Sequence, residues 1–161
     1  MTATNIERNV YLSGTVVPES QAKISIFDSA VMLGDCVTES TRTFAHKPFK
    51  LGEHITRLYR SLKVARIDPG LSPEKMLVVT MELLQKNLRT INQGDDFWIV
   101  HNISRGLAVA GPDPTVSQSG ATVMIHNATM DLTGWAEFYA QGCHAVTPMS
   151  RAIPSQSLDA R

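Results

Sequence analysis

The sequence predicts an α+β fold, in which a strand-rich first third leads into two helices and then into further strands. Three observations support this class. Apolar residues make up 43% of the 161 residues, which is enough to form a core. Short alternating apolar runs fill the first third, whereas the next stretch repeats its apolar side chains at helical spacing. The length suits one average domain.

The N-terminal strands are predicted from short apolar runs separated by turn residues. The run NVYLSGTVVP indicates two strands joined at Ser13-Gly14. Ile24 and Ile26 alternate with polar neighbours in AKISIFD, which favours a half-buried strand. VTESTRTF and KPFKL are typical of a hairpin whose turn lies near Ala45 to Pro48.

Two helices are expected next. The first runs from about Glu53 to Arg66, because its apolar residues fall on one stripe, and the turn residues DPG end it. This stripe consists of Ile55, Leu58, Tyr59, Leu62 and Ala65. The second helix has Ser72 as its N-cap and Pro73 at its first position, and it continues through KMLVVTMELLQKNL.

The last third predicts strands on either side of a loop. FWIVHNIS is typical of a buried strand, and ATVMIHN and GCHAVTPMS indicate two more. Between them, RGLAVAGPDPTVSQSG is rich in proline, glycine and serine, as a linker is. The sequence therefore predicts an N-terminal α/β domain over residues 1–105, a linker over 106–120, and the start of an incomplete C-terminal domain over 121–161.

Composition argues against several classes of partner. Fifteen basic and fifteen acidic residues leave no net charge to attract nucleic acid or an anionic membrane. No apolar run approaches the ~20 residues of a membrane helix, and the N-terminus has no signal-peptide core. Cys36 and Cys143 form no C-x-x-C pair, which favours reduced thiols without a metal site. These observations predict a soluble cytoplasmic protein that binds neither nucleic acid nor membrane.

No catalytic signature stands out from the residues alone. The chain contains no G-x-S-x-G elbow, no G-x-G-x-x-G and no Walker loop. Three arginines near the ends of predicted elements remain as candidates: Arg42, Arg57 and Arg105. On its helix, Arg57 lies roughly 135° from the centre of the apolar stripe, at about 100° per residue. A single domain would leave Arg57 exposed to solvent, whereas a second domain on that face would make it an interface residue.

Five short motifs follow one another in a recognisable order. They are Ser13-Gly14 in a hairpin, Ala22 to Asp28 (A-x-I-x-x-x-D), Gly34 to Glu39 (G-D-x-x-x-E), Phe49 to Leu58 (F-x-L-x-x-H-x-x-R-L) and Ile103 to Gly106 (ISRG). The ordered set resembles the N-terminal half of the class IV pyridoxal-phosphate aminotransferases. That family includes branched-chain and D-amino acid aminotransferases and aminodeoxychorismate lyase. The resemblance implies fold type IV, an N-terminal α/β domain followed by the opening strands of a C-terminal barrel-like domain.

The resemblance also implies a cofactor and a reaction. In the family the arginine of H-x-x-R-L binds the phosphate of pyridoxal 5'-phosphate, and this role carries over to Arg57, whose forked guanidinium suits a phosphate. The lysine that forms the Schiff base is expected just beyond Arg161, so we assign no catalytic residue among the 161 and expect about half of a family member. The implied reaction is transamination between an amino donor and a keto acid by a homodimer.

Four residues are substrate-site candidates on the same resemblance. D-amino acid aminotransferases place a tyrosine at the position of Val31, and branched-chain enzymes place one at Leu33. Both residues are apolar here and predict an apolar pocket wall. Arg42 matches the arginine in the F-E-G-I-R motif of the branched-chain enzymes, although pairing with Glu39 or another carboxylate is equally compatible with the sequence. Arg105 of ISRG is the fourth candidate.

Two alternatives to transamination stay open. An elimination of the aminodeoxychorismate-lyase type would use the same cofactor but release pyruvate without a keto-acid acceptor. A non-catalytic fragment is the other alternative, because the Schiff-base lysine is not among the 161 residues. Against the fragment, the apolar stretches IFDSAVMLG and ATVMIHN keep the side chains that a module freed of its partner domain would replace with polar ones.

Overall fold

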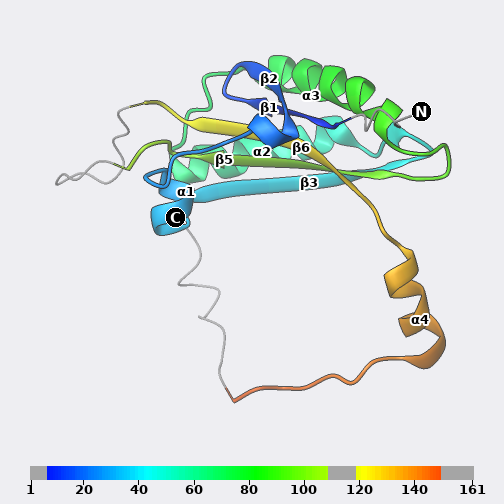
Figure 1. Ribbon diagram of the computed structural model, residues 1–161. Helices are drawn as coiled ribbons and strands as arrows, with labels where there is room; N and C mark the ends of the chain where they lie inside the picture. The colour runs from blue at the N-terminus through cyan, green and yellow to red at the C-terminus, as the bar shows by residue number, and fades with distance from the viewer. Residues whose placement is uncertain (1–6, 109–118, 150–161) are drawn as a thin grey trace. The chain divides into compact units, whose positions relative to one another are not determined.

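A computed structural model describes residues 7–108 and 119–149, and its main feature is an antiparallel sheet (Figure 1). Within these residues six strands pair in the order β2-β1-β6-β5-β3-β4, as an open sheet. The strands are β1 (Asn9–Leu12), β2 (Thr15–Pro18), β3 (Cys36–Phe44), β4 (Lys47–Pro48), β5 (Phe97–Ser104) and β6 (Thr122–Thr129). The chain divides into two compact units, residues 1–129 and 130–161, and the sheet belongs to the first.

Two helices of fifteen residues, α2 (Leu51–Ala65) and α3 (Pro73–Asn87), cover one face of this sheet (Figure 1). Helix α2 contacts β3, α3 contacts β1 and β6, and the two helices contact each other. The predicted stripe of α2 is confirmed, since Ile55, Leu58 and Leu62 are buried. The predicted N-cap of α3 is also confirmed, because the Ser72 hydroxyl accepts a hydrogen bond from the Lys75 backbone N–H at 3.2 Å.

The sheet has a buried face and a more exposed face because successive strand side chains alternate. In β5, Ile99 and Ile103 are fully buried, whereas Trp98 is 43% exposed. The neighbouring strand β6 contributes Ile125 to a core that also contains Ile103 and the buried residues of α2 and α3. A side chain at an alternate position of a strand therefore points either towards the two helices or away from them.

Both predicted hairpins are present. Ser13 and Gly14 link β1 to β2 with φ of 43° and 98°, and Ala45 and His46 link β3 to β4 with φ of 47° and 66°. Two successive residues with positive φ twist the chain in the sense that matches the flanking strands, which is why such turns join tight hairpins. The hairpin of β3 and β4 leads directly into α2, so it determines where that helix begins.

The strand expected for AKISIFD is wrong. A single turn of 3-10 helix, η1 (Glu19–Gln21), precedes this segment, and Ile24 and Ile26 are 41% and 70% exposed. Alternation alone does not make a strand, because a strand also needs a paired neighbour, and this segment pairs with neither edge strand, β2 or β4. A short helix, α1 (Ser29–Leu33), follows instead, and the sequence pattern did not indicate it.

The expected boundary between the two domains also differs from the structure. Composition places residues 121–129 in a second domain, yet β6 lies inside the sheet, paired with β5 along its whole length and with β1. The first compact unit therefore continues to Thr129. The linker composition marks a long connection between two paired strands, of which residues 109–118 lie outside the described part of the chain.

The second unit carries one helix, α4 (Thr133–Gln141), in its described part. The strand expected at GCHAVTPMS is not formed, since residues 142–148 have no helix or strand. The opening strands of a barrel-like domain are thus not present within residues 130–149, and the rest of that prediction lies outside the described residues. A 3-10 turn, η2 (Leu88–Thr90), completes the described elements after α3.

Candidate functional site

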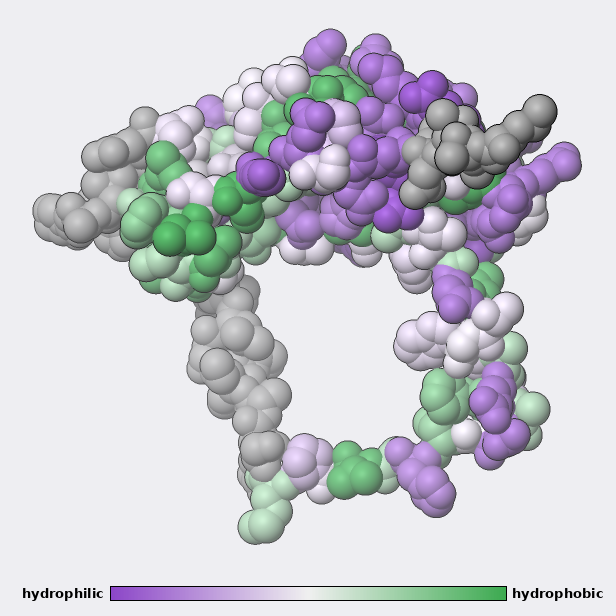
Figure 2. All heavy atoms as spheres, in the orientation of Figure 1, coloured by the Kyte–Doolittle hydropathy of each residue, from purple (hydrophilic) through white to green (hydrophobic). Residues whose placement is uncertain are grey.

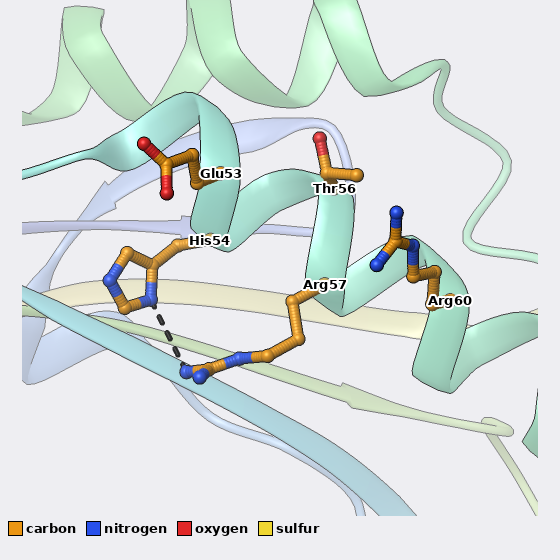
Figure 3. Close-up of a pocket in the computed structure, with 5 residues that line it drawn as sticks. All are labelled: Glu53, His54, Thr56, Arg57 and Arg60. Atoms are coloured by element: carbon orange, nitrogen blue, oxygen red, sulfur yellow. Dashed lines mark hydrogen bonds between the residues drawn. The ribbon is translucent and has the colours of Figure 1, made fainter.

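An ion pair joins the second turn of α2 to the middle of β3. The Arg57 guanidinium donates from Nε to Glu39 Oε2 at 2.6 Å and from Nη2 to Glu39 Oε1 at 2.5 Å. The His54 ring nitrogen Nδ1 lies 2.8 Å from the same Oε1. It also lies 3.3 Å from Arg57 Nη2, the contact drawn in Figure 3. Such a two-bond pair fixes the plane of the guanidinium as well as its position.

Local sequence explains why these three side chains meet. His54 and Arg57 are three residues apart on α2, so they lie on neighbouring positions of one helix face. Glu39 stands at an alternate position of β3 and points towards the helices, where it is only 5% exposed. The side chain of Arg57 is 66% exposed. A buried carboxylate therefore holds a guanidinium whose outer edge faces solvent.

The electrostatics keep Glu39 charged. Burial by itself raises the pKa of this carboxyl, but hydrogen bonds from Arg57, His54 and the Ser40 backbone N–H outweigh burial and lower the pKa to about 2. The same contact raises the pKa of Arg57. Both partners of the ion pair are consequently charged across the whole physiological pH range, and the guanidinium stays in its fixed orientation.

A hollow of about 430 Å³ opens beside this ion pair. It is lined by Glu53, His54, Thr56, Arg57 and Arg60, all from α2 (Figure 3). A guanidinium has five N–H groups, and Glu39 takes two of those of Arg57. The outer edge of Arg57 can therefore donate to an anion in the hollow while its bonds to Glu39 remain. Arg60 adds a second positive charge, and the one acidic side chain of the lining, Glu53, pairs with Lys50 at 3.1 Å, so the hollow suits a phosphate better than a cation.

Val31 and Leu33 lie on α1 and are 55% and 66% exposed. Neighbouring side chains of the same segment are exposed too: Phe27 at 60% and Met32 at 55%. Figure 2 shows hydrophobic side chains gathered over α1. An exposed apolar patch on a folded domain marks a surface that binds something apolar. The position of these residues is thus compatible with the predicted apolar wall.

Arg42 lies near the other end of β3 from α1. Its Nη2 is 3.6 Å from Asp96 Oδ2, its Nε donates to the Thr43 carbonyl at 3.0 Å, and its guanidinium carbon is 4.1 Å from the centre of the Phe44 ring. Of the two roles that the sequence left open, the structure therefore provides the carboxylate partner, and that partner is Asp96 rather than Glu39. The role of Arg42 towards a substrate stays a prediction.

Arg105 is held more completely. Its Nε donates to Asp35 Oδ2 at 2.7 Å, and its two terminal nitrogens donate to the backbone carbonyls of Ala65 and Arg66, each at 2.9 Å. Only 13% of its side chain is exposed. Of the three arginines predicted around a ligand, Arg57 has the most accessible polar edge and Arg105 the least.

The partners of Arg57 are not evident in the sequence, in which Glu39 is instead a candidate partner of Arg42. The i, i+3 spacing of His54 and Arg57 is visible in HITR, but nothing local shows that Glu39 faces this helix. That contact depends on the β3–β4 hairpin, which folds α2 back over β3. Within residues 7–108 and 119–149, no group of three or more potential ligands is gathered for a metal ion.

The sequence of this chain is similar to those of known aminotransferases, although no family model matches it. A putative branched-chain-amino-acid aminotransferase of Methanocaldococcus jannaschii is 33% identical over 150 residues, which are 93% of this chain and 49% of that protein. D-alanine aminotransferase of Staphylococcus haemolyticus is 32% identical over 78 residues, 48% of this chain and 28% of that protein. The chain therefore spans at most about half the length of these curated relatives.

Solved structures agree with the sequence relatives. A branched-chain amino acid aminotransferase of T.th., complexed with N-(5'-phosphopyridoxyl)-L-glutamate, is 27% identical, with a TM-score of 0.64 over 75% of this chain and 40% of that chain. Escherichia coli branched-chain amino acid aminotransferase has a TM-score of 0.66 at 23% identity, over 76% of this chain and 41% of that chain. The second likeness concerns the fold alone. Among the described residues no helix is long and apolar enough to cross a membrane.

Proposed function

We propose a role in pyridoxal-phosphate-dependent transamination for this chain, which is related in sequence and fold to the N-terminal half of the class IV aminotransferases. The observation that carries the proposal is the Arg57 guanidinium, held on two bonds by buried Glu39 while its outer edge lines the hollow on α2. A phosphate monoester is the ligand that this edge fits, because three oxygens of one charged group can accept its N–H donors.

The residues of the chain then have distinct tasks. Arg57 binds the cofactor phosphate, and Glu39 with His54 holds the guanidinium in the orientation that the phosphate requires. Val31 and Leu33 provide an apolar wall for the side chain of the amino donor. When bound, the cofactor supplies the electron sink that transamination needs. The lysine that the resemblance implies for covalent attachment of the cofactor is assigned to none of the 161 residues.

Arg42 is proposed as a second substrate contact, at the far end of β3. A substrate carboxylate would have to compete there with Asp96, which lies at 3.6 Å from Arg42 Nη2. That separation is longer than a strong charged hydrogen bond, so the pair can open for a better acceptor. The resemblance further supports a homodimer that transfers an amino group between an amino acid or amine and a keto acid.

Cofactor binding tests the proposal directly. Pyridoxal 5'-phosphate is titrated into the protein and into the variants Arg57→Ala and Arg60→Ala, with the Kd obtained from the absorbance of the cofactor. We expect the Kd of Arg57→Ala to rise roughly ten- to hundredfold, the value of one or two charged hydrogen bonds. Arg60→Ala removes the same charge from the same hollow without losing the Glu39 contact, and it should change the Kd much less.

The outcome separates three functions. Equal affinity of the wild type and Arg57→Ala would contradict the phosphate role. Transfer of the amino group only in the presence of a keto acid is the expected reaction. Release of pyruvate in the absence of a keto acid would instead indicate an elimination of the aminodeoxychorismate-lyase type. A protein that binds no pyridoxal 5'-phosphate would leave a non-catalytic function.

A further inference from the structure

Arg105 lies where three elements of the first unit meet. It follows the end of β5, and its side chain reaches the turn after α1 and the C-terminal end of α2. Nε and Nη2 donate to the two carboxylate oxygens of Asp35 at 2.7 and 3.4 Å. Nη1 donates to the carbonyl of Arg66 and Nη2 to that of Ala65. Two motifs that are seventy residues apart, GD and SRG, are thus joined by one side chain.

These contacts leave little of Arg105 for a ligand. A guanidinium has five N–H groups, and four of them are used by Asp35 and by the two carbonyls at the end of α2. The cation stands at the end of α2 where the helix dipole is negative, so its charge is stabilised in place. A substrate carboxylate would find one free N–H on a side chain that is 13% exposed. A positioning role fits these contacts better than the substrate role expected from the sequence.

The backbone beside Arg105 binds α1 at its start as well. The Arg105 backbone N–H donates to the Ser29 hydroxyl at 3.1 Å, and the Ser29 backbone N–H donates to the Gly106 carbonyl at 2.7 Å. The Ser29 hydroxyl in turn donates to the Asp35 carbonyl at 3.2 Å. Helix α1 is therefore attached to residues 105 and 106 both where it begins and just after it ends.

We propose that Arg105, through Asp35, is a positioning residue that fixes the apolar wall of α1 relative to the anion site of α2. Arg57 precedes Ala65 by eight residues, or about 12 Å of helix at ~1.5 Å per residue. Because α2 is rigid over that length, a bond to its last carbonyls sets α1 against the helix that carries Arg57. The inference rests on the proposed function for its meaning, but the attachment itself can be tested without it.

Amide hydrogen exchange tests the attachment in the protein without cofactor. In Arg105→Gln we expect exchange to become at least roughly tenfold faster in residues 29–35, while residues 73–87 of α3 keep their wild-type rates. Arg105→Lys should lie between the two, because it keeps a charge near Asp35 but not the planar set of donors. Arg8→Gln is the matched control, since it breaks a bidentate pair with Glu19 away from α1 and should leave residues 29–35 unchanged.

Donor selectivity tests the consequence. In Arg105→Gln the Kd for pyridoxal 5'-phosphate should stay within about threefold of the wild type, because the Glu39–Arg57 pair is intact. The ratio of kcat/KM for leucine to kcat/KM for alanine should fall roughly tenfold, because the larger side chain needs the wall in place. Arg105→Lys should recover part of this ratio.

Two results would overturn the inference. Exchange that accelerates equally in residues 29–35 and 73–87 would show that Arg105 only stabilises the fold. An unchanged leucine-to-alanine ratio in an enzyme that transaminates both would show that the attachment does not place the wall. A wild-type protein that binds no pyridoxal 5'-phosphate would overturn the proposed function instead, and the exchange pattern would still decide whether Arg105 holds α1.

Discussion

Arg57 on the second turn of α2 and Arg105, whose side chain reaches the last turn of α2 from the end of β5, each bind a carboxylate with two bonds, yet the two pairs are built in opposite ways. At the second turn, the carboxylate of Glu39 is buried with 4% of its side chain exposed, and the Arg57 side chain is 66% exposed. Past the last turn, the Arg105 side chain is 13% exposed and that of Asp35 is 28% exposed. The first pair presents its cation to solvent, and the second encloses it.

This difference teaches how to separate a binding arginine from a structural one. A carboxylate partner by itself does not decide the question, because both arginines have one. What decides is the number of N–H donors left over and the side on which they lie. Glu39 takes two of the five at Arg57, and His54 Nδ1 lies 3.3 Å from the same Nη2, whereas Asp35 and two backbone carbonyls take four of the five at Arg105. The comparison predicts that loss of Arg57 mainly weakens the binding of an anion, whereas loss of Arg105 mainly destabilises the fold.

The largest expected effect is on stability. Arg105→Met should lower the free energy of unfolding by about 3 kcal/mol, because it leaves Asp35 unpaired and removes the donors of two helix carbonyls. Arg57→Met should cost clearly less, since His54 and the Ser40 N–H still bind Glu39. Chemical denaturation without cofactor measures both. Equal losses would mean that exposure does not distinguish the two pairs.

The next effect is a pH dependence at the Glu39 end. His101, the cross-strand neighbour of Glu39, is fully buried, and burial lowers its pKa to about 4. The His101 ring is therefore protonated below about pH 6.5 in the unfolded chain but stays neutral in the folded protein down to about pH 4. As a result, the free energy of unfolding should fall by about 2 kcal/mol between pH 6.5 and 4. The lowered pKa of Glu39 adds a further loss from about pH 4.5 down to 2.

A titration of stability with pH checks both windows. His101→Asn should remove most of the slope between pH 6.5 and 4 and keep the slope below pH 4.5. Burial also lowers the pKa of His126, so this residue should account for part of the loss of stability that remains between pH 6.5 and 4 in the variant. If His101→Asn lost as much stability between pH 6.5 and 4 as the wild type, the pKa of His101 would not be lowered in the folded protein.

A polar substitution in the apolar wall of α1 should change the selectivity for the amino donor without changing the stability of the protein. Leu33→Gln alters a side chain that is 66% exposed, so the free energy of unfolding should change by less than about 0.5 kcal/mol. The KM for leucine should nevertheless rise roughly tenfold relative to that for alanine, the value of burying one such side chain. Steady-state kinetics with the two donors measure the ratio. A KM that rises equally for both would place Leu33 outside the substrate site.

The smallest effect is expected at a third arginine pair, in which both partners are open. Arg8 binds Glu19 with two bonds, and their side chains are 34% and 48% exposed. Arg8→Gln should lower the free energy of unfolding by less than about 1 kcal/mol, because water screens such a pair. Denaturation in low and high salt measures it. A loss as large as that of Arg105→Met would show that the number of bonds, and not their burial, sets the energy.

The sequence determined much of the framework by itself. The apolar stripe of α2, the Ser72 cap of α3, the two hairpin turns and β5 depend on local spacing and turn chemistry, and the structure confirms each of them. The order of short motifs predicted the similarity to aminotransferases that the comparison with curated relatives also finds. That order also predicts Arg57 as a ligand of a phosphate, whereas the periodicity of its helix favours a solvated position.

Only the tertiary structure decided which side chains share a site. AKISIFD alternates as a strand does but has no partner strand, and ATVMIHN belongs to the first sheet because β5 and β1 both pair with it. The carboxylate partners of Arg57 and Arg105 lie eighteen and seventy residues away, one across a hairpin and the other beside the paired ends of β3 and β5. Spacing along a chain records neighbours within one helix or strand, whereas a carboxylate binds whichever arginine the packing of separate elements brings within about 3 Å. That packing separates the accessible guanidinium from the enclosed one.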